Sequence, residues 1–328
     1  MGRREFIAGI GGAAAWAVAA WAQQPALPVV GFVTTRSERA STYVVDAFRK
    51  GLHETGYDEG RNVTVEYHWL EGQFDRLPAL MADLVRRRVA IIATPGNTLV
   101  STAAKAATTT IPIVFAVGTD PVKTGLVASF ARPGGNVTGI NYFFLEVSAK
   151  RLALLHALSP KAIRVVILVN PANGPSADLT SRIVQDSAQS IGLQSQILYA
   201  TTSREIDLAF ASIAQERAEN ILFVAADGFF QSRGEQLISL TARNRIPAAY
   251  PDRTAVVAGG LMSYGTDGAD MYRQVGVYTG KVLKGAKPAD LPVQQSTKFE
   301  FVINRKTAKG LGLEIPVMLV VSATELID

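Results

Sequence analysis

Short apolar runs alternate with amphipathic segments along most of this chain. The apolar runs are rich in Val and Ile and are bounded by turn residues; they cover residues 29–33, 63–67, 89–93, 113–117, 165–169 and 221–225. Between them, apolar residues recur three and four positions apart, as in Val44, Val45, Phe48 and Leu52. The first pattern is typical of buried parallel strands and the second of helices that cover a sheet. The alternation predicts a doubly wound α/β protein.

The two halves of the chain repeat one order of features. In the first half, an apolar run leads to Thr94-Pro95-Gly96, a helix and Ile111-Pro112; in the second, an apolar run leads to Ala226-Asp227-Gly228, a helix and Ile246-Pro247. Such a duplication predicts two lobes, each a doubly wound parallel sheet, joined by a hinge. The length agrees, at roughly 150 residues per domain.

The lobe boundaries follow from where the repeated pattern starts and stops. We expect residues 23–143 and about 266–290 to form lobe 1, and residues 144–265 and about 291–328 to form lobe 2. The hinge is then expected in the segments that pass between the lobes, near 141–147, 263–267 and 289–293.

The N-terminal residues 1–22 predict an export signal. Arg3-Arg4 precede an uncharged run, 8–22, that ends in Ala20-Trp21-Ala22, so cleavage is expected before about Gln23 and the mature protein in the periplasm. The adjacent arginines followed by Glu and Phe resemble a twin-arginine signal, and a signal for general export is the alternative.

Composition narrows the class of protein. No later uncharged stretch reaches the ~20 residues that a membrane helix needs, and without cysteine the chain has no disulfide and no lipid-modified Cys. Loss of Arg3, Arg4 and Glu5 changes the net charge from +5 to +4. The one basic cluster, 86–88, ends an expected helix and is interpreted as a solvated helix end, so no nucleic acid partner is expected. The three histidines are far apart, and we expect no metal, no cofactor and a monomer.

Loops at the carboxyl ends of the strands would line one cleft if the lobes face each other, because open α/β sheets bind ligands there. These loops mix hydroxyl, amide, carboxylate and aromatic groups, which suits a small polar ligand. We expect ligand contacts from Thr35, Arg36, Thr94, Gly96, Asn97, Asp120, Asn141, Tyr142, Asn170, Asn173, Ser176, Asp227, Phe229, Phe230 and Tyr264.

Several of these residues have an alternative structural role. The segment 94–97 either offers helix N-terminal amides to a ligand carboxylate or forms a plain N-cap. Asp120 either holds an ammonium or hydroxyl group or caps the helix after Pro121. Arg36 either pairs with a ligand carboxylate or lies in a solvated turn.

The aromatic residues allow the same two interpretations. Phe229 and Phe230 are adjacent, so we expect that both cannot face one core and that at least one stacks on a ligand. Tyr264 is either a second stacking face or a half-buried tyrosine on a strand edge.

Motifs spread over the whole mature length resemble a known family. They are Gly51-Leu52, Gly56-Tyr57, Glu59-Gly60-Arg61-Asn62-Val63, Ile111-Pro112-Ile113-Val114-Phe115, Asp120-Pro121, Gly134-Gly135-Asn136-Val137-Thr138-Gly139, Asn170-Pro171, Leu283-Lys284-Gly285-Ala286-Lys287-Pro288 and the run 308–316. In order and spacing the chain resembles the tryptophan/tyrosine-type family of ABC-transporter substrate-binding proteins. The resemblance implies a hinged type I periplasmic-binding fold that closes on an amino acid or aromatic compound and delivers it to a membrane permease.

One loop departs from that family's pattern. After Asn170-Pro171 the family tends to carry an acidic residue and Asn-Ser, whereas this chain has Ala172-Asn173-Gly174-Pro175-Ser176. The resemblance implies that this loop is a selectivity element, so the ligand need not be the family's amino acid.

Two other classes of function compete with transport. An exported sensor that feeds a membrane receptor would share the fold. An exported hydrolase-type enzyme would need acid and base groups, which Asp120, Asp227 and Asp252 supply only if they converge. The dinucleotide-type run 9–14 precedes the first strand, so it lacks the strand-to-helix context that the mechanism requires, and no nucleophile elbow, zinc helix or phosphate loop is present. No catalytic residue is therefore expected.

Overall fold

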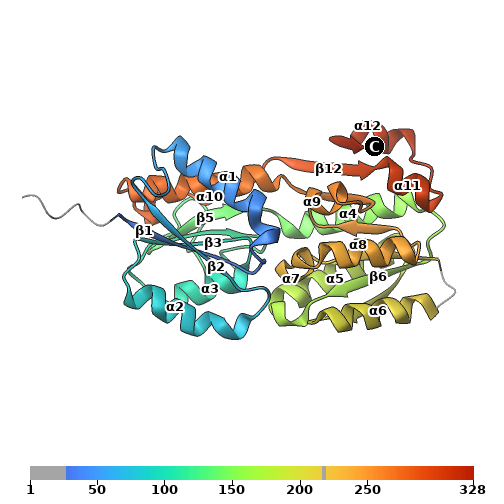
Figure 1. The fold of residues 1–328 in the computed structure, drawn as a ribbon, viewed down its shortest axis with the longest axis horizontal. Helices are drawn as coiled ribbons and strands as arrows, with labels where there is room; N and C mark the ends of the chain where they lie inside the picture. Colours follow the sequence, from blue (N-terminus) through green and yellow to red (C-terminus); the bar gives the residue numbers. More distant parts are fainter. Residues whose placement is uncertain (1–26, 216–218) are drawn as a thin grey trace, which may run out of the picture.

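Two β-sheets, each covered by helices on both faces, carry the fold (Figure 1). The computed structural model describes residues 27–215 and 219–328. The expected export signal, 1–22, lies outside the described residues. The prediction of two doubly wound α/β lobes is confirmed.

The sheet of the first lobe is parallel throughout. Its order is β11-β5-β4-β3-β1-β2. The strands are β1 (Val29–Thr34), β2 (Thr64–Trp69), β3 (Ile91–Pro95), β4 (Ile113–Val117), β5 (Val137–Asn141) and β11 (Gln294–Gln295). Every residue of β3, β4 and β5 is buried, because helices cover both faces. This burial explains the apolar runs at β3 and β4, whereas β5 is buried although its sequence mixes apolar and polar residues.

Two helix pairs cover this sheet. Helices α1 (Thr42–Glu54) and α10 (Gly268–Leu283) pack on one face, and α2 (Leu77–Arg86) and α3 (Thr98–Ala107) pack on the other. The first pair approaches closely through two glycines: a Cβ at Gly51 would lie 1.9 Å from the Arg273 carbonyl oxygen, and one at Gly276 would lie 2.1 Å from that of Phe48. Glycine is therefore required where these helices cross.

The sheet of the second lobe has the order β13-β12-β10-β9-β8-β6-β7. Its strands are β6 (Arg164–Val169), β7 (Gln194–Tyr199), β8 (Asn220–Val224), β9 (Ala248–Tyr250), β10 (Met262–Thr266), β12 (Phe299–Asn304) and β13 (Glu325–Ile327). Strand β12 runs antiparallel to β10, whereas the other pairs among the described strands are parallel. This single reversal is not visible in the apolar pattern.

Helices cover both faces of the second sheet as well. One face carries α4 (Phe144–Leu158), α5 (Pro175–Ser190), α11 (Arg305–Leu311) and α12 (Val317–Ser322). The other carries α6 (Ser203–Gln215), α7 (Gly228–Ser232) and α8 (Gly234–Arg243). Helix α9 (Arg253–Val257) follows β9, and short 3-10 turns are η1 (Arg39–Ser41), η2 (Phe74–Arg76), η3 (Pro171–Asn173) and η4 (Pro288–Asp290).

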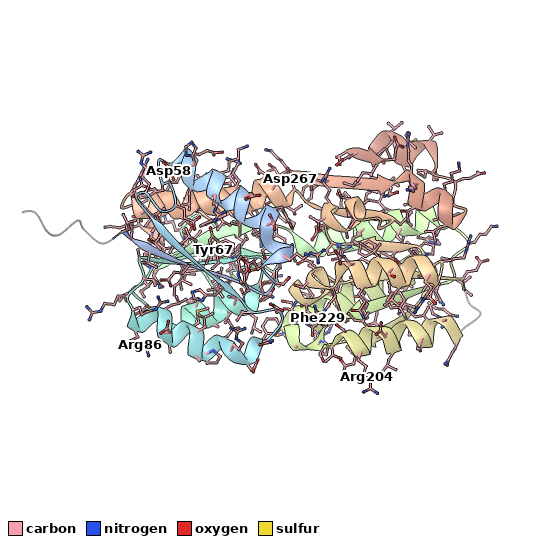
Figure 2. All side chains as sticks on the ribbon, in the orientation of Figure 1. Asp58, Tyr67, Arg86, Arg204, Phe229 and Asp267 are labelled. Atoms are coloured by element: carbon pink, nitrogen blue, oxygen red, sulfur yellow. The ribbon has the colours of Figure 1, made fainter. Side chains whose placement is uncertain are left out.

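The described chain passes between the lobes three times. It crosses from β5 to α4, from β10 to α10, and from β11 to β12. Asp267 marks the second passage at the junction of the lobes (Figure 2). The expected third passage near 289–293, and with it the start of lobe 2 at about 291, is wrong: Gln294 and Gln295 pair with β5 of the first sheet. The third passage is therefore 296–298, a shift caused by a two-residue strand too short to give a pattern.

Candidate functional site

A cavity of about 90 Å³ lies between the lobes, where loops after β1, β3 and β5 face loops after β8, β9 and β10. Six of the expected site residues line it, namely Thr35, Arg36, Gly96, Asn97, Tyr142 and Asp227. A wider outer pocket of about 590 Å³ adjoins it, because Arg36, Tyr43, Gln231, Pro251 and Asp252 line both. The carboxyl ends of the two sheets thus meet at one site.

Asp227 places a carboxylate with one free oxygen in this cavity. Its Oδ1 caps α7 by accepting from the Phe229 and Phe230 amides, and it also accepts from Asn170 Nδ2 at 3.0 Å. Its Oδ2 is buried, and no donor of the described residues lies within 3.5 Å of it in hydrogen-bonding geometry, although the Asn173 side chain is close enough to affect the carboxylate. Burial raises the pKa of Asp227, and the donors of Asn170, the Phe229 and Phe230 amides and the Asn173 side chain oppose this rise. A donor from a ligand would satisfy Oδ2 and favour the ionised form.

Asn97 joins the two lobes at the same place. Its side chain caps α3 by accepting from the Val100 amide, and its Nδ2 donates to Asn173 Oδ1 at 3.0 Å across the cleft. The N-terminus of α3 therefore faces the cavity, as expected for the segment 94–97. The residue of that segment that caps the helix is Asn97. Thr94 is buried in β3, where its Oγ1 lies 2.9 Å from Ser101 Oγ, so its expected ligand contact is not supported.

Arg36 is a buried cation that is already paired. Its Nη2 donates to Tyr272 Oη at 3.3 Å and to Asp252 Oδ2 at 3.5 Å, and its guanidinium lies 5.2 Å from the ring centre of Tyr43. Burial opposes its charge, but Tyr272, Tyr43 and Asp252 outweigh burial and hold the pKa of Arg36 above its usual value. The alternative of a solvated turn is wrong, because β1 ends inside the cleft. Arg36 instead links the first lobe to Asp252 of the second.

Three tyrosines of the first lobe form an aromatic wall of the cavity. Tyr43 and Tyr272 are in an edge-to-face contact, with ring centres 5.8 Å apart, and Tyr142 donates to the Gly96 carbonyl oxygen at 3.1 Å. Burial raises the pKa of Tyr142, so its hydroxyl remains a donor. Tyr43 and Tyr272 come from α1 and α10, and sequence reasoning restricted to strand ends missed both.

Arg151 is the most buried charge of the cavity wall. It is 1% exposed, and its guanidinium lies 4.2 Å from the ring centre of Phe223. Its Nε and Nη2 have no hydrogen-bond partner. The sequence analysis missed it, although one signal was available: Arg151 lies within the apolar helix stripe formed by Val147, Leu154 and Leu158. A cation in such a stripe faces the protein interior.

The expected stacking role of Phe229 and Phe230 is wrong. Both rings are buried, at 5% and 1% exposure, in the core of the second lobe. Their centres are 5.6 Å apart. Helix α7 begins at Gly228, so the two side chains are about 100° apart around a helix and do not alternate as they would on a strand. Phe229 lies at the border of the lobes (Figure 2), where its Cβ approaches Gly72 of the first lobe.

Three further expected residues have structural roles outside the cavity. Asp120 Oδ1 accepts from the Val122 and Lys123 amides, so Asp120 does act as a cap, but of a turn at 121–125 and not of the expected helix. Asn141 Nδ2 donates to the carbonyl oxygens of Val117 and Thr119. Tyr264 stacks on Phe299 within the second sheet, which agrees with the half-buried alternative.

The remaining expected residues lie behind the cavity wall. Asn170 caps η3 and holds Asp227, and Asn173 holds Asn97. Ser176 lies in the first turn of α5, where its carbonyl oxygen accepts from Thr180 Oγ1. Asp120, Asp227 and Asp252 do not converge, since Asp120 is outside the cavity.

Residues 27–215 and 219–328 lack two features that would change the class of site. They contain no group of His, Asp and Glu that could hold a metal ion. Within the same residues, no helix is long and apolar enough to cross a membrane.

Solved structures and a curated relative resemble this chain over most of its length. A structure from Streptococcus pneumonia, described as an ABC domain in complex with L-Trp, is 24% identical, with a TM-score of 0.80 over 92% of this chain and 100% of that chain. A conserved domain protein from Vibrio cholerae is 25% identical, with a TM-score of 0.80 over 91% and 99%. The tyrosine-binding protein of Clostridioides difficile is 27% identical over 81% of this chain and 76% of its own length.

The two lobes, the three passages between them and the cavity at their interface define a solute-binding protein of the type I periplasmic-binding fold. Residues 29–327 match the family model of the ABC transporter substrate binding proteins, and this chain belongs to that family. It is thus a member of a family of binding proteins, not of an enzyme family.

Proposed function

We propose that this chain is the periplasmic solute receptor of an ABC importer, and that it captures an amino acid or a related amine between its lobes. The observation that carries the amine is the buried, unpartnered Oδ2 of Asp227. An ammonium group is the complementary donor, since it supplies three N–H groups and a positive charge. The similarity to a tyrosine-binding protein and to a structure in complex with L-Trp supports an amino acid.

Binding is coupled to closure in this proposal. The ligand binds one lobe first, and the contacts of the other lobe then favour the closed form over the open one. In the described closed arrangement, Asn97 contacts Asn173 and Arg36 contacts Asp252 across the cleft. A closed, loaded monomer released from its export signal would then dock on an inner-membrane permease and deliver the ligand.

Calorimetry with matched ligand pairs tests this function. The mature chain from Gln23 is titrated with each common amino acid and with its deaminated analogue, for example L-tyrosine and 3-(4-hydroxyphenyl)propanoate. We expect an amino acid to bind and its deaminated partner to bind at least tenfold more weakly, because a charged hydrogen bond is worth about 1.5–3 kcal/mol. Asp227→Asn should lose a similar factor.

Asp120→Asn is the matched control, because Asp120 also caps a turn but lies outside the cavity. It should leave affinity unchanged. Equal binding of the deaminated ligands, or unchanged affinity in Asp227→Asn, would remove the amine from the proposal. Conversion of the ligand during the titration would instead indicate an enzyme.

A further inference from the structure

Arg151 has no partner for two of its donors, although it is almost fully enclosed. Its side chain comes from α4, lines the cavity and lies against the face of Phe223. The ring contact offsets only part of the cost of burying a guanidinium. Burial lowers the pKa of Arg151 to about 9. The group is therefore still charged at neutral pH, and the charge needs an anion.

The free donors define the shape of the anion. Nε and Nη2 are the unpartnered atoms. They form one edge of the planar guanidinium, whose two N–H groups are parallel and match the two oxygens of a carboxylate. A neutral hydroxyl or carbonyl group would satisfy one of them only.

The carboxylates of the described cavity wall do not serve Arg151. Asp252 is the anion that raises its pKa, but the Asp252 oxygens are occupied by Arg36, Gln231 and Thr254. Asp227 exerts no such effect on Arg151. Phe223, against which Arg151 stacks, precedes Asp227 by four residues, or roughly 13 Å of extended backbone. No hydrogen bond or ion pair joins Arg151 and Asp227 among the described residues, so the unpaired cation and the unpaired anion occupy separate positions on the cavity wall.

A ligand whose two charges are adjacent cannot satisfy both groups. The ammonium and carboxylate of a simple α-amino acid share one carbon, so either Arg151 or Asp227 would stay buried and unpaired, which is unfavourable. The cavity also favours a small ligand. Its volume is about 90 Å³.

Resting on the proposed function, we infer that Arg151 is a specificity-determining residue that binds a carboxylate remote from the ligand's ammonium. The cargo is then a short amine with charges at both ends, either an acidic α-amino acid or an ω-amino acid. Asp227 holds the ammonium, and the guanidinium edge of Arg151 holds the distal carboxylate.

Titration calorimetry with four probes and three variants tests the inference. The probes are L-tyrosine, L-glutamate, L-2-aminoadipate and 5-aminovalerate. We expect one of the three acids with separated charges to bind the wild type at least tenfold more tightly than L-tyrosine. Arg151→Met should weaken that acid at least 30-fold and leave L-tyrosine unchanged or tighter. Arg151→Lys should recover part of the lost affinity, since lysine restores the positive charge but cannot form the bidentate pair of hydrogen bonds.

Arg233→Met is the matched control. Arg233 also lies over a phenylalanine ring, that of Phe229, but it lines the outer pocket and not the inner cavity. It should not discriminate among the probes. Thermal melting checks folding, and apo Arg151→Met should melt at or above the wild-type temperature, because an unpaired buried charge is removed.

The outcomes separate the two proposals. A preference for glutamate or aminoadipate over aminovalerate assigns an acidic α-amino acid, and the reverse preference assigns an ω-amino acid. Tyrosine binding as tightly as every acid, or acid binding unchanged in Arg151→Met, overturns the role of Arg151 while the proposed function stands. Failure of all amines, including the common amino acids, overturns both.

Discussion

At the scale of the residue, pairing divides the charged groups of the cleft into two kinds. Arg36 and Asp252 neutralise each other across the lobes. Asp227 and Arg151 are as deeply buried, but each has a polar atom without a partner. Paired groups stabilise the closed form. Unpaired buried groups destabilise it until a ligand supplies the missing partners. Ligand recognition is thus expected at the second kind.

A substitution at Phe230 tests whether Phe229 and Phe230 are core residues and not ligand contacts. Phe230→Ala should lower the free energy of unfolding by about 3–5 kcal/mol, because a fully buried ring is lost from the second core. Chemical denaturation measures the loss. Tyr199→Ala, at a position 60% exposed, is the control and should change stability by no more than about 0.5 kcal/mol. Weaker ligand binding with normal stability in Phe230→Ala would restore the stacking hypothesis.

The sequence predicted polar residues at strand ends but not side chains that reach the cavity from helices. Asp227 and Asn97 follow strands, so the parallel-sheet rule located them. Tyr272 and Arg151 come from the middle of helices, and which helix face points to the cleft depends on packing between distant segments. The same rule wrongly included Asn141, because it cannot separate a side chain that binds a ligand from one that holds its own loop.

At the scale of the element, the apolar pattern predicted most strands and failed for short or reversed ones. Strand β11 has two residues, and β12 is antiparallel to β10. A two-residue strand is too short to show an apolar pattern, and an antiparallel strand has the same pattern of apolar residues as a parallel one. In that pair Gly265 lies opposite Glu300, close to the second passage between the lobes. Partial burial and the charge of Asp267 raise the pKa of Glu300 to about 6, against the opposing effect of Arg253.

This carboxyl group makes stability depend on pH. Its folded pKa lies above the unfolded value of 4.5, so the native state binds the extra proton and stability falls as pH rises from about 4.5 to 6. Glu300→Gln should be more stable than the wild type at pH 7 to 8, by about 1 kcal/mol once solvent screening is allowed for. The difference should vanish below about pH 4.5. Melting curves across this range measure it.

Exposed Glu314→Gln serves as the control for Glu300→Gln. It should track the wild type at every pH. A Glu300→Gln variant that does the same would mean that β12 presents this side chain to water.

At the scale of the whole molecule, few contacts hold the lobes in the closed arrangement. Arg36 bonds to Asp252, Asn97 to Asn173, and the Ser37 amide donates to Ser232 Oγ. Among the described strands, none pairs with a strand of the other sheet. The equilibrium between open and closed forms is therefore expected to respond to single substitutions in this set.

Arg36→Met should shift the free protein towards the open form. Loss of the bonds to Asp252 and Tyr272 should increase the radius of gyration in X-ray scattering without ligand and weaken ligand binding about tenfold, or ~1.4 kcal/mol. Arg39→Met is the control, because Arg39 pairs with Glu235 at the exposed rim, where an ion pair contributes little. An unchanged radius in Arg36→Met, or equal shifts in both variants, would contradict the role of Arg36 as the interlobe contact.

The three passages between the lobes also impose an order on biosynthesis. Helix α10, which covers one face of the first sheet, and β11, which completes its edge, are made only after most of the second lobe. While the ribosome is still translating the second lobe, the apolar face of α1 and the edge of β5 therefore lack their partners. The lobe that begins first in the sequence is completed only after most of the other lobe has been made, and neither lobe exists as a continuous stretch that a truncated transcript or a gene fusion could supply intact.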